Sequence, residues 1–356
     1  MAFSFNDIEF ALLLLLAFLL FFFGLKKREV AISGKYSGID LLMSAAIKGI
    51  SCVLILMGHY VTIRSRVCDI SLFSNIIQST TATIALTLFM FFSGYGLSVK
   101  RTNGGGNFTT WIKRLKKVYI PLFLTCLLTL VIYAILPEKF SLEESTTWSV
   151  SKDIWYLHHF DISYLKTLIP HLFGWKDWYV FCIMIFYSLF YLSDYLTHNK
   201  NENQTWVLWL FFVVYFIGAY FVFGKEEAHW YRYCWAFFLG HVWGKSVKNG
   251  VINKKDLLLL VLLSLTILFE NIFLIIDYFI AIAILLLCSK LNKNYTLNSK
   301  LLAFMGSISY FFYLSHERIG GVLMAYAQLY SVVLWIGITI LISFCLLKAY
   351  NKAFYK

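Results

Sequence analysis

Long apolar stretches separated by short polar segments limit what this chain can fold into. A helix needs about 20 apolar residues to cross the hydrocarbon core of a bilayer, where all backbone polar groups must be bonded internally. Such stretches occupy residues 8–25, 41–63, 73–99, 118–136, 178–196, 205–223, 233–247, 257–270, 272–289, 301–323 and 330–347. We therefore predict an all-α, polytopic integral membrane protein, a bundle of about eleven transmembrane helices.

The composition agrees with a membrane protein, since 60% of the residues are hydrophobic and only 14% are charged. A soluble domain of this length needs more polar surface. The net charge of +12 is therefore a matter of topology, and we predict no nucleic-acid partner.

One boundary has two interpretations: Glu270 and Asn271 mark either a turn between two spans or a kink within one long span.

The first apolar stretch predicts the orientation of the chain. It follows an acidic beginning and precedes Lys26, Lys27 and Arg28, which is the reverse of a secretory signal peptide. Basic residues favour the cytoplasmic side, and threading the chain from this cluster leaves most Lys and Arg there. We predict a multi-pass protein of the cell (plasma or inner) membrane, with its N-terminus outside and its C-terminus cytoplasmic.

Two ionisable residues in the second stretch are the leading candidates for chemistry. Lys48 and His59 are eleven positions apart, close to three helical turns, so they share one face of a helix. Their separation along the axis is roughly 16 Å. Ionisable groups in a span are costly unless they face a partner or a cavity, which favours a functional role. The alternative is that His59 reaches the outer interface and Lys48 pairs with a carbonyl group.

A second group of candidates follows the third stretch. Ser93, Gly94 and Tyr95 interrupt an aromatic run, and Gly94 would let another backbone or a ligand come close. Beyond them lies a glycine-containing cytoplasmic segment with candidate phosphate-binding cations at Arg101, Lys113, Arg114 and Lys117. The alternative is ordinary positive-inside anchoring beside anionic lipids.

A third group lies at the predicted outer side. Tyr313 and His316 recur at helical spacing near the end of the tenth stretch, and Glu317 follows directly. Trp178, Tyr179 and Arg232 begin or adjoin other spans on that side. Bonding between helices and interfacial anchoring are the alternatives for these residues. Metal chemistry finds no support, because the adjacent His158 and His159 suit one metal poorly, so we predict no metal.

These stretches, in this order, resemble the acyltransferase family 3 membrane proteins, which acylate sugars and glycans. The corresponding segments are Lys48 to His59, FMFFSGY at 89–95, Arg114 to Pro121, and SYFFYLSH at 309–316. The resemblance implies an acyltransferase-family-3-like membrane domain at 31–356, preceded by an extra N-terminal transmembrane helix at 1–30. The family usually has Arg where this chain has Lys48, which keeps the charge but loses the bidentate fork.

The resemblance implies a transferase that moves an acyl group from cytoplasmic acetyl-CoA to a hydroxyl of a cell-surface or lipid-linked glycan such as an exopolysaccharide. His59 would be a general base or a transient acyl carrier, and Lys48 would stabilise negative charge. The expected donor contacts are Ser93, Gly94, Tyr95, Arg101, Lys113, Arg114 and Lys117. The expected acceptor contacts are Trp178, Tyr179, Arg232, Tyr313, His316 and Glu317.

A polytopic glycan flippase, polymerase or transporter is the competing class of function. Such proteins are expected to place several charges in the middle of the membrane or to contain inverted repeats. Only Lys48 is clearly in the middle of a predicted span, and we find no repeat. The sequence therefore favours O-acetylation over transport, with the lipid bilayer and a glycan acceptor as the expected partners.

Overall fold

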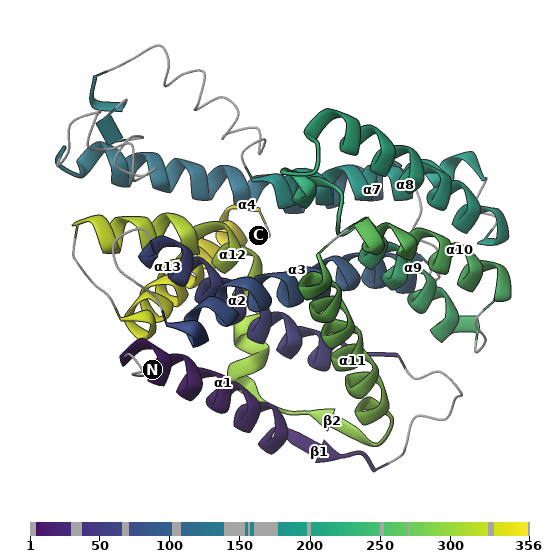
Figure 1. Cartoon of the computed structure of the whole chain (residues 1–356), viewed down its shortest axis with the longest axis horizontal. Helices are drawn as coiled ribbons and strands as arrows, with labels where there is room; N and C mark the ends of the chain where they lie inside the picture. Colours follow the sequence, from purple (N-terminus) through teal and green to yellow (C-terminus); the bar gives the residue numbers. More distant parts are fainter. Residues whose placement is uncertain are drawn as a thin grey trace.

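The computed structural model describes residues 5–29, 38–65, 71–101, 108–138, 154–155, 157–159, 177–197, 201–249, 253–269, 271–326 and 331–354. Within these ranges the chain is a bundle of helices (Figure 1). The α-helices are α1 (Phe5–Phe23), α2 (Leu41–Arg64), α3 (Leu72–Arg101), α4 (Phe108–Ile135), α7 (Trp178–Leu196), α8 (Asn201–Phe223), α9 (Cys234–Asn249), α10 (Lys254–Ser264), α11 (Ile272–Asn294), α12 (Lys300–Tyr326) and α13 (Val332–Phe354). Each predicted apolar stretch corresponds to one of them.

The predicted all-α, multi-pass architecture is confirmed, whereas the number of spans is not. Seven helices of the described residues are long and apolar enough to cross a membrane, namely α2, α3, α4, α7, α8, α11 and α13. Helices α9 and α10, with 16 and 11 residues, are shorter than a full crossing requires. Eleven complete spans therefore stay a prediction.

The helix is interrupted between α10 and α11, and this decides between the two interpretations of Glu270 and Asn271. A 3₁₀ segment (Leu265–Phe269) follows α10, and Asn271 then caps the start of α11 by accepting a hydrogen bond from the Phe273 backbone N–H at 3.1 Å. Helix α10 packs on α8 and α9, whereas α11 packs on α3. Residues 257–289 thus form two helices with different neighbours.

Helices α2, α3, α9 and α12 form the centre of the bundle, where glycines allow very close crossings. A Cβ atom on Gly94 of α3 would lie 2.0 Å from the Phe237 carbonyl oxygen of α9. One on Gly306 of α12 would lie 2.2 Å from the Ala45 carbonyl oxygen of α2. Small residues let helix backbones approach in this way. In an apolar 18-residue segment of α3, 78% of the residues are buried, whereas the corresponding value for α8 is 17%. Helix α3 is therefore central and α8 peripheral.

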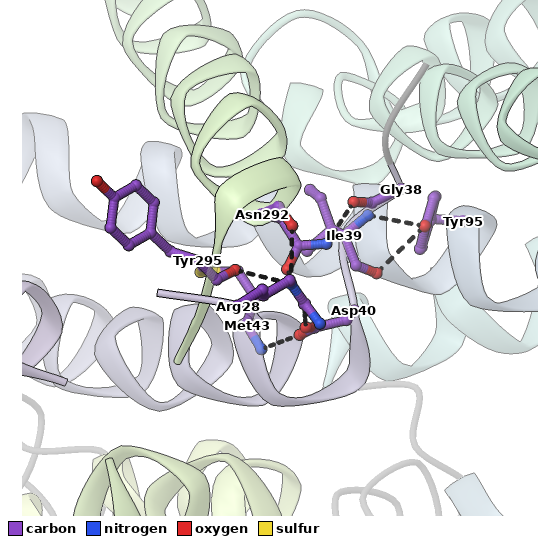
Figure 2. A network of polar contacts seen from close by, with 8 residues as sticks. All are labelled: Arg28, Gly38, Ile39, Asp40, Met43, Tyr95, Asn292 and Tyr295. Carbon is purple, nitrogen blue, oxygen red and sulfur yellow. Dashed lines mark hydrogen bonds and ion pairs between the residues drawn. The ribbon is translucent and has the colours of Figure 1, made fainter. Parts of the chain in front are cut away.

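A polar network joins several helix ends on one side of the bundle (Figure 2). Strand β1 (Leu25–Lys27) pairs antiparallel with β2 (Tyr295–Leu297), and Arg28 follows β1. The Arg28 Nε donates to the carbonyl oxygens of Asn292 and Tyr295, each at 3.1 Å, and its guanidinium pairs with Asp40. Asp40 also caps α2 by accepting from the Met43 N–H at 2.8 Å. The network therefore fixes the start of α2, on which His59 lies.

The acidic beginning of α1 docks on the N-terminal ends of two other helices, α3 and α13. Asp7, 1% exposed, accepts hydrogen bonds from the hydroxyls of Ser71 at 2.6 Å and Ser74 at 2.9 Å, at the N-terminus of α3. Glu9 accepts from the Ser331 hydroxyl at 2.8 Å and the Val332 N–H at 3.0 Å, at the N-terminus of α13. Carboxylates are stabilised beside helix N-termini. The acidic residues that argued against a signal peptide are thus packing contacts of α1.

Most of the segment between α4 and α7 lies outside the described residues, including Trp148, His171 and Trp175.

Candidate active site

Two imidazole rings from distant parts of the chain face one another inside the bundle. The centroid of the His59 ring on α2 lies 4.9 Å from that of the His316 ring on α12, with an angle of 75° between the ring planes. His59 keeps part of its surface exposed, whereas His316 is only 2% exposed. The sequence predicted a role for each histidine but not that the two rings are neighbours.

His316 is held through its backbone and one of its ring nitrogens. Its Nδ1 lies 2.5 Å from the Tyr313 carbonyl oxygen. The indole N–H of Trp335 on α13 donates to the His316 carbonyl oxygen at 2.8 Å. The other ring nitrogen, Nε2, is buried and has no hydrogen-bond partner within the part of the chain that the structure describes.

Aromatic rings of α7, α12 and the turn before α9 extend from the histidines. The Tyr313 ring centroid lies 5.7 Å from that of His316 and 4.8 Å from that of Tyr179. Trp178 stacks on Tyr233, with ring centroids 5.8 Å apart and planes 17° apart. The structure thus brings together four of the six predicted acceptor contacts: Trp178, Tyr179, Tyr313 and His316.

The remaining two predicted acceptor contacts lie at the edge of this aromatic group. Glu317 is exposed directly after His316. Arg232 is close enough to His229 for its charge to act on that ring, and His229 packs on Trp178 at 5.0 Å between ring centroids. Burial lowers the pKa of His229, although the carboxylate of Glu227, 3.1 Å away, raises it.

Lys48 lies on the same face of α2 as His59, near the other side of the bundle. Lys48 is partly buried, its ammonium nitrogen lies 5.6 Å from the centroid of the Phe92 ring, and the charge of Arg114 on α4 acts on it. Among the described residues Lys48 forms no ion pair. Cys52, one turn further along α2, donates its thiol to the Ser309 carbonyl oxygen at 3.3 Å. These contacts are consistent with the prediction that Lys48 and His59 share one face of a helix.

The predicted donor-binding cations separate into two groups. Arg114 is partly buried near Lys48, and Lys113 and Lys117 are exposed on the same helix. Arg101, in contrast, forms an ion pair with Asp194 of α7, which is 0% exposed, and a hydrogen bond with Gln204 of α8. Its guanidinium therefore ties α3 to two neighbouring helices.

The residues Ser93, Gly94 and Tyr95 point to different neighbours. Gly94 provides close contact with the α9 backbone, so the neighbour that approaches it here is another helix. The Tyr95 hydroxyl accepts from the Ile39 N–H at 3.0 Å and lies 3.2 Å from the Ile39 carbonyl oxygen (Figure 2). Ser93 is partly exposed and lies near the Tyr179 hydroxyl. Only Ser93 faces the aromatic group that adjoins the histidines.

The sequence interpretation missed an ion pair beside the histidines. The guanidinium of Arg318 on α12 lies 2.8 Å from the carboxylate of Asp177, which precedes α7. The two side chains are 16% and 18% exposed. An arginine directly after His316 and Glu317 was a usable signal, because a charge near a predicted span needs a partner. The pair joins α12 to the start of α7, where Trp178 and Tyr179 lie.

Metal binding finds no geometric support within the described ranges, where no group of three or more His, Cys, Asp or Glu side chains is placed to hold an ion.

Comparison with known proteins gives the family. The model of acyltransferase family 3, described as an acyltransferase domain, matches residues 36–349, nearly the whole chain. The match includes both histidines and Lys48, and α1 precedes it. A search of curated proteins and a search of solved structures found no match. The chain belongs to acyltransferase family 3 and is a membrane acyltransferase.

Proposed function

We propose that this protein is an O-acetyltransferase that moves an acetyl group from cytoplasmic acetyl-CoA to a hydroxyl of a cell-surface or lipid-linked glycan. The main support is that His59 and Lys48 share one face of α2, with a second imidazole beside His59 and the cation Arg114 of α4 near Lys48. The two side chains are separated by roughly 16 Å along the axis, so they suit opposite ends of one elongated substrate.

The surroundings of Lys48 suit an anionic ligand. Two cations close together in a low-dielectric interior repel one another, and an anion placed between them relieves this repulsion. Lys113 and Lys117 add exposed positive charge on α4. The phosphates of CoA match this group, because cationic side chains form strong, charge-assisted hydrogen bonds with phosphate oxygens. We assign Lys48, Arg114, Lys113 and Lys117 to the nucleotide end of the donor. We do not include Arg101, because it forms an ion pair with Asp194.

His59 is the proposed general base. It takes the proton of the acceptor hydroxyl, whose oxygen attacks the carbonyl carbon of the acetyl thioester. The bond between that carbon and sulfur then breaks, and the CoA thiolate takes the proton from the His59 imidazolium. Lys48 is too far from His59 to stabilise the oxyanion at the reacting carbon, so its charge acts on the donor phosphates.

The aromatic group suits the acceptor. Sugar rings have apolar faces that pack on aromatic side chains, while their hydroxyls need polar partners. Trp178 and Tyr313 are partly exposed beside the histidines, and Glu317 supplies an exposed carboxylate that accepts hydrogen bonds. In the proposed orientation in the cell membrane, with the N-terminus outside and the C-terminus cytoplasmic, this group faces outward. Glycan and donor would then approach His59 from opposite sides.

A donor assay separates the transferase from the competing class. We expect the purified protein in lipid nanodiscs to bind acetyl-CoA and to transfer or hydrolyse its labelled acetyl group. We also expect the acetyl content of surface glycans to fall in cells that lack the gene. A flippase, polymerase or transporter would neither bind acetyl-CoA nor change glycan acetylation, and that pair of results would overturn the proposal.

A further inference from the structure

We propose that His316 is a positioning residue that accepts a hydrogen bond from the His59 ring and thereby sets the tautomer of His59. The proposal rests on the proposed role of His59 as the base. Its basis is the juxtaposition of the two rings together with the His316 nitrogen that has no hydrogen-bond partner among the described residues.

The hydrogen bond at Nδ1 determines the protonation pattern of the His316 ring. A backbone carbonyl oxygen can only accept a hydrogen bond, so Nδ1, 2.5 Å from the Tyr313 oxygen, must be the N–H donor. In a neutral imidazole one nitrogen is a donor and the other an acceptor. Nε2 of His316 therefore has a lone pair.

This lone pair needs a donor, and His59 is a neighbour that can supply one. The His316 ring is 2% exposed, and a buried polar atom left without a partner costs free energy. The ring of Phe312 stacks near that of His316, at 6.3 Å between centroids, but it has no polar hydrogen. Among the described rings that contact the His316 ring, which are those of His59, Phe312 and Tyr313, the His59 ring is the one with a ring N–H, at 4.9 Å between centroids and in an edge-to-face arrangement.

The backbone of His316 is held firmly, as a positioning role requires. The Trp335 indole donates to its carbonyl oxygen at 2.8 Å. One turn later, Gly320 leaves room for the same indole, because a Cβ atom there would lie 1.7 Å from the Trp335 Cζ2 atom. Helices α12 and α13 thus fix the direction in which the lone pair points.

The consequence concerns the other nitrogen of His59. If one nitrogen of the neutral His59 ring donates to His316, the second must be unprotonated and available to the acceptor hydroxyl. After the ring takes the substrate proton, its N–H toward His316 becomes a charge-assisted donor and strengthens this hydrogen bond. Loss of His316 should therefore lower kcat and leave the binding of acetyl-CoA largely unchanged.

Two substitutions separate this role from a structural one. His316→Asn places an amide N–H near the position of Nδ1 and can keep the bond to Tyr313, but has nothing at the position of Nε2. His316→Gln places its amide near the position of Nε2 and can still accept from His59. A merely structural role predicts a higher kcat for His316→Asn than for His316→Gln. The positioning role predicts the reverse, a higher kcat for His316→Gln. Ser307→Ala, on the exposed side of α12, is the control.

The test measures acetyl transfer in nanodiscs and the ¹⁵N NMR signals of histidine in the same samples. We expect kcat to fall about tenfold or more in His316→Asn and by less in His316→Gln, with KM for acetyl-CoA within about twofold in both. We also expect the His59 signals to change in His316→Asn. Equal kcat losses, or unchanged His59 signals, would overturn the proposal. Should the parental protein show no acetyl transfer, the proposed function fails, and the NMR signals still decide whether the two rings are hydrogen-bonded.

Discussion

Gly94 provides the sharpest test of the packing at the centre of the bundle. Replacing it with alanine would place a Cβ atom 2.0 Å from the Phe237 carbonyl oxygen, whereas ordinary contact begins near 3.4 Å. Helices α3 and α9 must therefore separate by about 1.4 Å, or the backbone must distort. Overpacking of this kind typically costs about 1–3 kcal/mol, which exceeds the gain of up to about 1 kcal/mol from helix propensity.

The same helix offers a matched control. A Cβ atom on Gly96 would meet nothing within 4 Å, so Gly96→Ala keeps only the gain in helix propensity. We expect Gly94→Ala to lower the midpoint of thermal unfolding by several degrees, at about 2–4 °C per kcal/mol, and Gly96→Ala to leave it unchanged or raise it. Tryptophan fluorescence of both proteins in the same detergent during heating gives the two midpoints.

The outcome also separates packing from ligand contact at this motif. If Gly94 mainly lines a passage for the donor, Gly94→Ala will unfold at the parental temperature and will have a raised KM for acetyl-CoA. That pattern would refute the packing account of Gly94. A lowered midpoint with an unchanged KM in the protein that remains folded would support it.

Three further substitutions test separate parts of the structure. Asp194→Asn leaves the buried guanidinium of Arg101 without its countercharge and should destabilise the protein by about 3–5 kcal/mol, measured as a lower unfolding midpoint; an unchanged midpoint would contradict the ion pair. Glu9→Ala removes two hydrogen bonds at the start of α13 and should cost about 1–2 kcal/mol by the same measurement, whereas Leu12→Ala, at a residue of α1 that is 59% exposed, should cost less. Lys48→Gln should raise KM for acetyl-CoA about tenfold or more with a smaller change in kcat, and Lys48→Arg should restore it; equal KM values would remove Lys48 from the donor site.

The helices were predictable because the membrane imposes a minimum apolar length on each of them. The shared face of Lys48 and His59 was predictable as well, since it depends only on helical periodicity within one segment. The decision between two helices and one kinked helix at Asn271 depends on a local N-cap, in which the Asn271 side chain accepts a hydrogen bond from the backbone N–H two residues later. In principle that signal was readable, since Asn is a preferred N-cap residue.

The contacts between helices were not predictable from one sequence. His59 and His316 are far apart in the chain and meet only because α2 packs on α12, which local patterns do not specify. The partner of Arg101 is likewise a residue on another helix, so its position in a cationic segment suggested a phosphate contact. Gly94 was compatible with either a ligand or a backbone, and only the position of α9 distinguishes them.

The proposed function rests on His59 as the base for acyl transfer from acetyl-CoA. Its most direct test measures transfer of labelled acetyl groups by the parental protein and by His59→Ala, both in nanodiscs and both with the same unfolding midpoint. We expect transfer by the parental protein and a loss of about 100-fold or more in the variant, with acetyl-CoA still bound. A folded His59→Ala protein that transfers acetyl groups at the parental rate would contradict it.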